Sequence, residues 1–243
     1  MLKSAQTVID IQPDAVSVAG KVGHWLLELA LKAKDRFTVC LSGGSTPKLL
    51  YQSLADKKIA EQMPWEIIHW FWGDERFVSK KDPLSNYHMV EEAMLSKVRI
   101  PAKNIHAINT EVKEPVLAAA MYEKELKSYY GSDRLDPEKP LFDVTLLGLG
   151  PDGHTASLFP GTDVLSERLA WASAVVGVKP EARITLTYPV LESSQAVAFL
   201  VTGREKREIA KQVITGASEL PAARVRPTGT LFWFFDEAAY PRI

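Results

Sequence analysis

Cysteine is almost absent from this sequence of 243 residues, and long apolar runs are missing altogether. The single cysteine, Cys40, has no partner for an internal disulfide, and its place in the apolar segment 37–41 favours a buried strand residue over a nucleophile. No apolar run reaches the roughly 18 residues that a membrane-spanning helix needs. The first residues also lack the apolar stretch and cleavage site of an export signal. We therefore expect a cytoplasmic protein that is not bound to membranes.

The sequence also lacks an excess of charge of either sign. Its 29 lysines and arginines are nearly balanced by 30 aspartates and glutamates, so no overall field favours binding to nucleic acid. His-x3-His spacing and clusters of cysteine are missing too, which argues against a structural zinc site. Any anionic ligand must therefore be met by a local site, and we expect no metal and no nucleic-acid partner.

What the sequence does contain is an ordinary globular composition, with 46% hydrophobic and 24% charged residues. Short apolar runs, typical of buried strands, alternate with segments of helical periodicity. The expected strands are residues 37–41, 67–72, 144–147, 172–178, 184–187, 196–201 and 230–235, and the expected helices are residues 14–34, 48–57, 86–98, 118–130 and 206–215. This alternation predicts an α/β fold with a mainly parallel sheet flanked by helices, in one domain over residues 1–243.

A glycine-rich turn that carries one acid and one imidazole follows the strand expected at residues 144–147. The segment 148–161 reads Gly-Leu-Gly-Pro-Asp-Gly-His-Thr-Ala-Ser-Leu-Phe-Pro-Gly, and its glycines let the backbone turn sharply beside a ligand. Ligands bind outside the carboxyl ends of strands in open parallel sheets, so chemistry is expected here. Asp152 and His154 together fit a general base near physiological pH. The alternative is that the imidazole merely caps a loop carbonyl.

The spacing of Gly148, Gly150 and Gly153 also matches the fingerprint of dinucleotide-binding proteins. A site of that kind needs a helix that begins within the turn and an acidic residue about 20 positions later. Pro151 and its polar neighbours crowd the turn, and residues 168–173 read Arg-Leu-Ala-Trp-Ala-Ser, without an acid. We therefore expect no nicotinamide cofactor.

A second glycine turn, Ser42-Gly-Gly-Ser-Thr-Pro47, joins an expected strand to an expected helix. Backbone N–H groups and the helix dipole at such a position form a cradle for an anion, here a phosphate. The spacing is not that of a P-loop. The alternative is an ordinary helix start, with Ser45 or Thr46 as the N-cap and Pro47 at the first helical position.

Charged residues also emerge where other expected strands end. In Gly73-Asp-Glu-Arg76, Arg76 is suited to a phosphate or a developing oxyanion, and an adjacent carboxylate could hold it in place. The alternative is a solvated loop with a surface ion pair of little energetic value. Arg183 and Lys206 each lie at the edge of an expected strand, where they either complete an anion site or are simply solvated.

Four separated segments together resemble the 6-phosphogluconolactonase family, in their order and spacing over nearly the whole chain: residues 41–47, 72–76, 148–161 and 183–187. That family is related to glucosamine-6-phosphate isomerase/deaminase. The resemblance implies a Rossmann-like fold, no obligatory cofactor, and the pentose-phosphate step that converts 6-phospho-D-glucono-1,5-lactone and water to 6-phosphogluconate. Its site carries over onto Ser42, Gly43, Gly44, Ser45, Thr46, Asp74, Glu75, Arg76, Asp152, Gly153 and His154, with Arg183 and Lys206 as the basic positions after the central motif.

Lactone hydrolysis requires a base and stabilisation of negative charge on the carbonyl oxygen. We expect His154 to deprotonate the attacking water, and Asp152 to orient His154 or to position the water. Arg76 or backbone N–H groups would stabilise the oxyanion, and Asp74 is the next candidate for the base. A serine nucleophile is the rival mechanism, but the sequence has no Gly-x-Ser-x-Gly elbow.

Two other functions remain to be weighed against hydrolysis. Related isomerases carry a glutamate where this sequence has Phe159, so an acid/base partner for isomerisation is missing. A non-catalytic sugar-phosphate sensor would need only the phosphate cradle, and the presence of Asp152 with His154 favours an enzyme. The expected partner is thus a small sugar-phosphate lactone, and the protein is expected to be a monomer or a small homo-oligomer.

Overall fold

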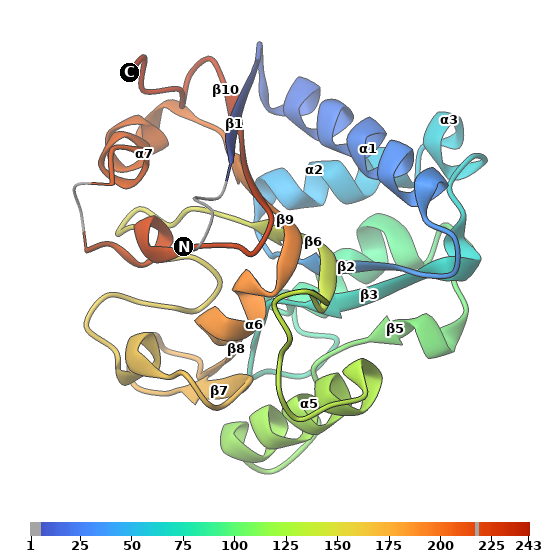
Figure 1. The fold of residues 1–243 in the computed structure, drawn as a ribbon, viewed down its shortest axis with the longest axis vertical. Helices are drawn as coiled ribbons and strands as arrows, with labels where there is room; N and C mark the ends of the chain where they lie inside the picture. Colours follow the sequence, from blue (N-terminus) through green and yellow to red (C-terminus); the bar gives the residue numbers. More distant parts are fainter. Residues whose placement is uncertain (1–5, 217–218) are drawn as a thin grey trace.

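The computed structural model describes residues 6–216 and 219–243, and its main feature is a seven-stranded sheet (Figure 1). Every strand pair in this sheet is parallel. The strands, in spatial order, are β1 (Thr7–Gln12), β10 (Thr230–Asp236), β9 (Ser194–Val201), β6 (Phe142–Leu147), β2 (Phe37–Leu41), β3 (Ile68–Trp72) and β5 (Ile105–His106). The parallel α/β fold expected from the sequence is confirmed.

A second, three-stranded antiparallel sheet lies beside the first and was not expected. It consists of β4 (Asp74–Arg76), β8 (Arg183–Leu186) and β7 (Ala172–Val175). The chain passes between the sheets at Gly73, whose N–H donates to Leu41 O at 2.9 Å and whose carbonyl accepts from Leu186 N at 2.8 Å. The Asp-Glu-Arg motif after β3, for which a solvated loop was the alternative, therefore forms a short strand.

Helices cover both faces of the large sheet (Figure 1). Helices α1 and α2 pack against each other on one face, and α5 lies on the other face with the small sheet. The helices are α1 (Ala15–Lys32), α2 (Ser45–Leu54), α3 (Lys57–Ala60), α4 (Asn86–Val90), α5 (Pro115–Tyr130), α6 (Tyr188–Glu192) and α7 (Arg207–Ile214). The expected helix 86–98 continues after α4 as a π-helical turn, Glu91–Leu95. Short 3-10 turns comprise Trp65–Ile67, Ala102–Asn104, Asp163–Ser166, Arg204–Lys206 and Pro221–Arg224.

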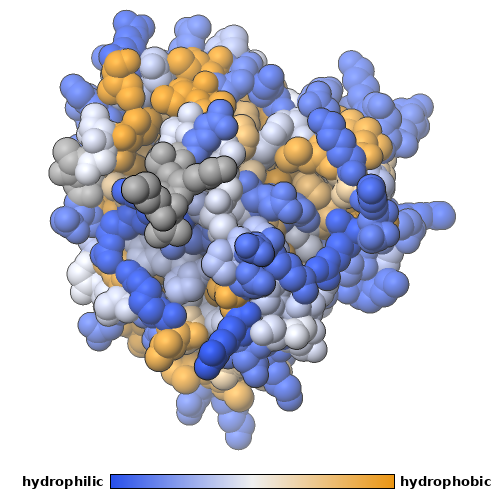
Figure 2. Space-filling model, viewed as in Figure 1, coloured by the Kyte–Doolittle hydropathy of each residue, from blue (hydrophilic) through white to orange (hydrophobic). Residues whose placement is uncertain are grey.

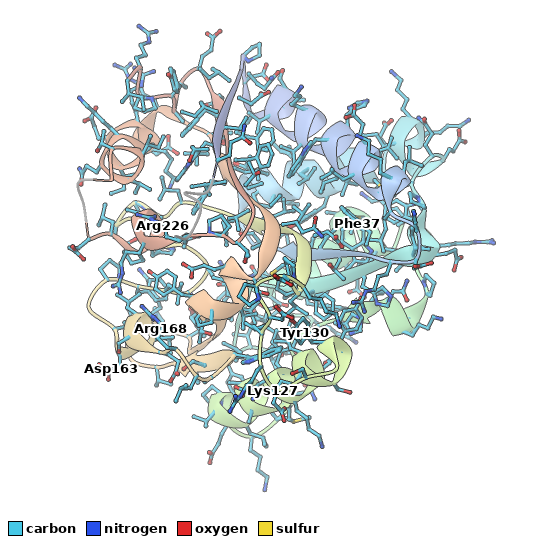
Figure 3. All side chains as sticks on the ribbon, in the orientation of Figure 1. Phe37, Lys127, Tyr130, Asp163, Arg168 and Arg226 are labelled. Atoms are coloured by element: carbon cyan, nitrogen blue, oxygen red, sulfur yellow. The ribbon has the colours of Figure 1, made fainter. Side chains whose placement is uncertain are left out.

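The central strands are buried because their residues are apolar on both faces, as parallel sheets require. All five residues of β2 are buried, including Phe37. Figure 3 labels Lys127 and Tyr130 on α5. The Tyr130 ring lies 5.7 Å from that of Trp171, just before β7, and Lys127 lies over the same indole, so these contacts link α5 to the small sheet. The face of the molecule shown in Figure 2 is largely hydrophilic, with separate apolar patches. Among the described residues, no helix combines the length and apolar character that crossing a membrane requires.

Candidate active site

The predicted site residues meet in a cleft of about 370 Å³. Ten of them line it: Ser42, Gly43, Gly44, Ser45, Thr46, Asp74, Arg76, His154, Arg183 and Lys206. Three others adjoin it: Glu75 lies between Asp74 and Arg76, Gly153 precedes His154, and Asp152 contacts His154. The volume lies within the range of roughly 300–1,000 Å³ that is usual for small-molecule sites.

The cleft forms where the strand order reverses. From β2 the chain moves outward to β3, and later it returns to β6 on the other side of β2. The turns after β2 and β6 therefore face each other, and the space beside Gly148 opens toward Ser42 Oγ, 3.8 Å from where a β-carbon would stand. Ligands of open α/β sheets bind at such a switch point.

The turn after β2 has the geometry of an anion cradle. Helix α2 begins at Ser45, and its N-cap is Gly44, with φ of 114° and no side-chain cap. This left-handed backbone favours glycine. The alternative interpretation, with Ser45 or Thr46 as the N-cap and Pro47 first in the helix, is therefore wrong. The first N–H groups of the helix have no intrahelical acceptor and can bind an anion.

Asp152 and His154 form a hydrogen-bonded pair at the turn after β6. The Asp152 carboxylate contacts Nδ1 of His154 and also accepts its backbone N–H at 3.2 Å. Burial alone would raise the pKa of Asp152, but the hydrogen bonds and charge of His154 outweigh it and lower that pKa. Asp152 therefore stays ionised and fixes the orientation of the imidazole. Nδ1 is engaged, which leaves Nε2 for a ligand in the cleft.

The two carboxylates of the Asp-Glu-Arg motif are buried and are held by different partners. Asp74 accepts from Ser157 Oγ at 2.7 Å and from Asn86 Nδ2 at 3.3 Å. Because Asp74 is 8% exposed and Glu75 2% exposed, the alternative of a solvated surface loop is wrong. The expected contact between a neighbouring carboxylate and the Arg76 guanidinium is also not what is found, since the guanidinium donates to Leu84 O instead.

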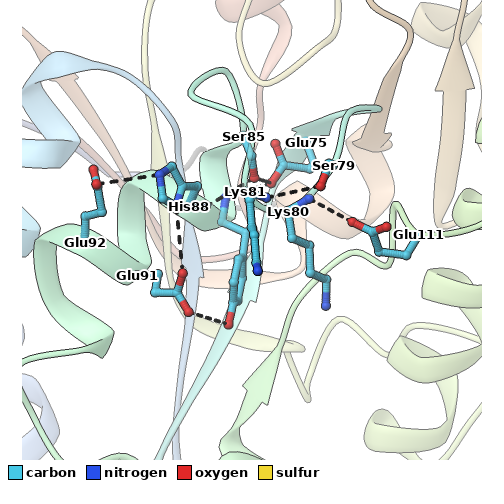
Figure 4. Close-up of polar contacts among 10 residues, drawn as sticks. Glu75, Ser79, Lys80, Lys81, Ser85, His88, Glu91, Glu92 and Glu111 are labelled. Atoms are coloured by element: carbon cyan, nitrogen blue, oxygen red, sulfur yellow. Dashed lines mark hydrogen bonds and ion pairs between the residues drawn. The ribbon is translucent and has the colours of Figure 1, made fainter.

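Glu75 holds two segments together beside the cleft (Figure 4). Its carboxylate accepts the backbone N–H groups of Arg76, Asn86 and Tyr87, each at 2.7 Å. Ser85 Oγ also donates to it, at 3.1 Å. Burial raises the pKa of Glu75, although these hydrogen bonds oppose the shift. Glu75 thus ties β4 to the start of α4, and so it fixes both Arg76 and Asn86 at the cleft.

Positive charge predominates in the cleft, with Arg76, Lys179, Arg183 and Lys206 against Asp74 and Glu205. The Nη1 atom of Arg183 is buried and has no hydrogen-bond partner among the described residues. Burial lowers the pKa of Arg183, and the nearby charge of Arg76 lowers it further. An unpaired buried donor of this kind is satisfied by an anionic ligand.

Among the cleft residues that the sequence alone did not identify are Asn86 and Lys179. Asn86 begins a helix after a polar loop, and only the fold shows that it lies against Gly43 and Asp74. Lys179 lies in a polar loop before β8, where sequence alone does not distinguish it from a solvated lysine. Within the described part of the chain, no three histidine, cysteine, aspartate or glutamate residues are grouped so that they could hold a metal ion.

The comparisons with known proteins agree on one family. The family model described as glucosamine-6-phosphate isomerases/6-phosphogluconolactonase matches residues 13–233. A 6-phosphogluconolactonase of Nostoc sp. is 41% identical over 238 residues, covering 95% of this chain and 96% of the relative. Another from Haemophilus influenzae is 40% identical over 209 residues, covering 83% of this chain and 85% of the relative.

Solved structures show the same fold. The 6-phosphogluconolactonase of Thermotoga maritima superimposes with a TM-score of 0.80 and 32% identity, covering 96% of this chain and 100% of that chain. A monomeric glucosamine-6-phosphate deaminase superimposes equally well, with a TM-score of 0.80, but at 18% identity. That second likeness concerns the fold alone.

Proposed function

This chain belongs to the glucosamine-6-phosphate isomerase/6-phosphogluconolactonase family, and we propose that it hydrolyses 6-phospho-D-glucono-1,5-lactone to 6-phosphogluconate, in the oxidative branch of the pentose phosphate pathway. One observation carries the proposal. A single cleft contains the phosphate cradle and an excess of cations, and the Asp152–His154 pair lies at its edge. The cytoplasmic location and the metal-free reaction stay predictions from the sequence.

The substrate's phosphate is proposed to bind the cradle formed by residues 42–46. Backbone N–H groups at the start of α2 would donate to the phosphate oxygens. Lys206 lines the same cleft, and Thr202, the residue after β9, bonds to Thr46 of the cradle through its hydroxyl at 2.6 Å. Arg183 supplies the buried donor that lacks a protein partner. The sugar ring then extends toward His154.

Hydrolysis is proposed to begin when His154 Nε2 removes a proton from a water molecule. The water oxygen attacks the lactone carbonyl carbon, and the carbonyl oxygen takes the negative charge. When the carbonyl re-forms, the bond to the ring oxygen breaks, and that oxygen takes the proton back from His154. The Asp152 carboxylate holds the imidazole and stabilises its protonated form between the two steps.

The roles proposed for Asp74 and Arg76 follow from their partners. Asp74 reaches the cleft, but both of its carboxylate oxygens already accept hydrogen bonds from Ser157 and Asn86. This arrangement favours His154 over Asp74 as the base. Arg76 is fixed by Leu84 O and lines the cleft, so its remaining N–H groups can bind the oxyanion or the lactone hydroxyls.

Isomerisation with deamination is the rival reaction within this family. Phe159 stands where the resemblance gives the related isomerases a glutamate. Its ring is 3% exposed and lies 4.6 Å from the imidazole of His154. A hydrocarbon ring cannot exchange a proton, so the site supports hydrolysis better than isomerisation. A sensor without activity would not need the Asp152–His154 pair.

Removing the phosphate from the substrate tests the assignment of the cradle. The charge-assisted hydrogen bonds to phosphate contribute about 1.5–3 kcal/mol each, so glucono-1,5-lactone should have a kcat/KM lower by several powers of ten. Both lactones are assayed against their spontaneous hydrolysis in the same buffer. Equal kcat/KM for the two substrates would remove the role of residues 42–46.

A further inference from the structure

Lys179 is a cleft cation for which the mechanism above has no use. It lies in the loop between β7 and β8 and lines the cleft. Its Nζ is 5.2 Å from the centroid of the Phe159 ring, and that ring is 4.6 Å from the imidazole of His154. The Phe159 ring thus lies between the ammonium of Lys179 and the imidazole of His154. This arrangement places Lys179 on the side of the cleft that carries the proposed base.

The charge of Lys179 is not neutralised. Within residues 6–216 and 219–243, no carboxylate forms an ion pair with its ammonium group. Two other cations of the cleft each have one protein partner, because Arg183 lies 3.4 Å from Glu181 and Arg76 donates to Leu84 O, although both keep N–H groups available for the substrate. The face of an aromatic ring attracts a cation but leaves its charge and its N–H donors available.

Lys179 and Lys206 are attached to different parts of the site. Lys206 follows β9, whose next residue Thr202 is bonded to Thr46 in the cradle. Lys179 contacts Phe159 beside His154 instead. On the side of His154, the substrate group that gains negative charge during attack by water is the lactone carbonyl oxygen.

We propose that Lys179 donates a hydrogen bond to the lactone carbonyl oxygen and stabilises its negative charge after water adds. This inference rests on the proposed lactonase function. The proton of the water goes to His154, the new C–O bond forms, and the carbonyl electron pair moves to the oxygen that the ammonium contacts. When the ring C–O bond breaks, the ring oxygen takes the proton from His154, and Lys179 is unchanged. A donor already in place as charge develops stabilises the transition state more than the substrate.

The identity of residue 159 fits this role. A glutamate there, as the resemblance gives to the related isomerases, would form an ion pair with Lys179 and cancel its charge. Phe159 holds the ammonium near His154 without cancelling it. Phenylalanine in place of glutamate at position 159 thus removes an acid and also leaves the charge of Lys179 available to the oxyanion.

Lys179→Met tests the proposal, with Lys80→Met as the matched control. Lys80 Nζ also lies 5.2 Å from an aromatic ring, that of Tyr87, but Lys80 is not in the cleft. Lys179→Met should lower kcat about 10- to 100-fold, less than the loss of a buried oxyanion donor because Lys179 is exposed. KM and the inhibition constant of inorganic phosphate should change by less than about twofold, since the phosphate cradle is intact. Lys80→Met should behave as the wild type.

Restoring an ammonium group at position 179 shows whether the loss of activity comes from the missing charge or from altered packing. The Lys179→Cys variant can be alkylated with 2-bromoethylamine, which rebuilds a lysine-like side chain. The native Cys40 is fully buried, and burial raises the pKa of its thiol, so it should not react. We expect kcat to recover most of its loss after alkylation, and the treated wild type to keep its activity.

The outcomes distinguish this proposal from the lactonase function itself. Unchanged kcat in Lys179→Met would overturn the role of Lys179, and so would a loss seen only as weaker inhibition by inorganic phosphate. In both cases an active wild type keeps the lactonase function. A wild type that does not accelerate lactone hydrolysis would overturn both.

Discussion

The imidazole of His154 lies so close to Gly150 that a β-carbon on Gly150 would stand 2.1 Å from the ring. The two residues are also joined by the backbone, since Gly150 N donates to His154 O at 2.8 Å. The turn after β6 therefore closes on itself around the proposed base. The glycine at position 150 is required by the position of the imidazole.

Gly150→Ala is predicted to lower kcat by about 100-fold, because the added methyl group must displace the imidazole from Asp152. Gly20→Ala, in α1 and outside the cleft, is the control for the added methyl group. Its β-carbon would meet no atom within 4 Å, so its activity should stay close to that of the wild type. Steady-state kinetics and thermal melting of both variants check this. Similar losses of activity in the two would contradict the steric account.

The sequence predicted the large sheet well because its strands are apolar on both faces, as in β2. The first strand, β1, was not anticipated. It is an edge strand in which exposed and half-buried residues alternate, and both Asp10 and Gln12 interrupt the apolar pattern. Two strands of the small sheet were expected, at residues 172–178 and 184–187, but the separate antiparallel sheet was missed, because β4 has three residues and pairs with β8, more than a hundred positions away. A pairing between residues so far apart cannot be recognised from the sequence near either strand.

The candidate site was predicted from glycine turns and charges at strand ends. What remained hidden were contacts between distant segments, such as Ser157 Oγ with Asp74 and Lys179 with Phe159. The capping role of Glu75 was hidden for the same reason, since it depends on α4 starting beside β4.

No ammonia or fructose 6-phosphate should form from glucosamine 6-phosphate above the control without enzyme. Phe159 cannot exchange the proton that isomerisation requires. The assay is run at protein concentrations that complete lactone hydrolysis within seconds. Either product at a rate comparable with lactone turnover would show that another carboxylate supplies the missing acid.

The stability of the fold should fall below neutral pH because of His69. Its Nδ1 lies 3.0 Å from His106 Nε2, and burial, followed by the charge of His106, lowers the pKa of His69 to about 4. The unfolded chain binds that proton near the ordinary pKa of about 6.5. The folded state therefore has its full stability above pH 6.5 and loses it as the pH falls toward 4.

Urea unfolding at several pH values checks this linkage. We expect a loss of about 1–3 kcal/mol across that interval, at the lower end because the ring is only part-buried and solvent screens its charge. His69→Gln should make the curve of unfolding free energy against pH less steep in the same interval. An equally steep curve in the variant would assign the titration to another group.

Chelators should leave the activity unchanged, because every group in the proposed mechanism belongs to the protein. The test is lactone hydrolysis after dialysis against EDTA, with and without added zinc or magnesium. Activity that is lost in EDTA and restored by one metal would show that the metal-free mechanism is wrong.

The most direct test of the central claim compares acid release from freshly prepared 6-phosphogluconolactone by the wild type and by His154→Ala, both against spontaneous hydrolysis. The wild type should accelerate the reaction, and His154→Ala should lower kcat by about 100- to 10,000-fold while its circular dichroism spectrum and melting temperature stay near those of the wild type. Normal turnover in a folded His154→Ala protein would contradict the account and would move the base to another residue, with Asp74 the first candidate.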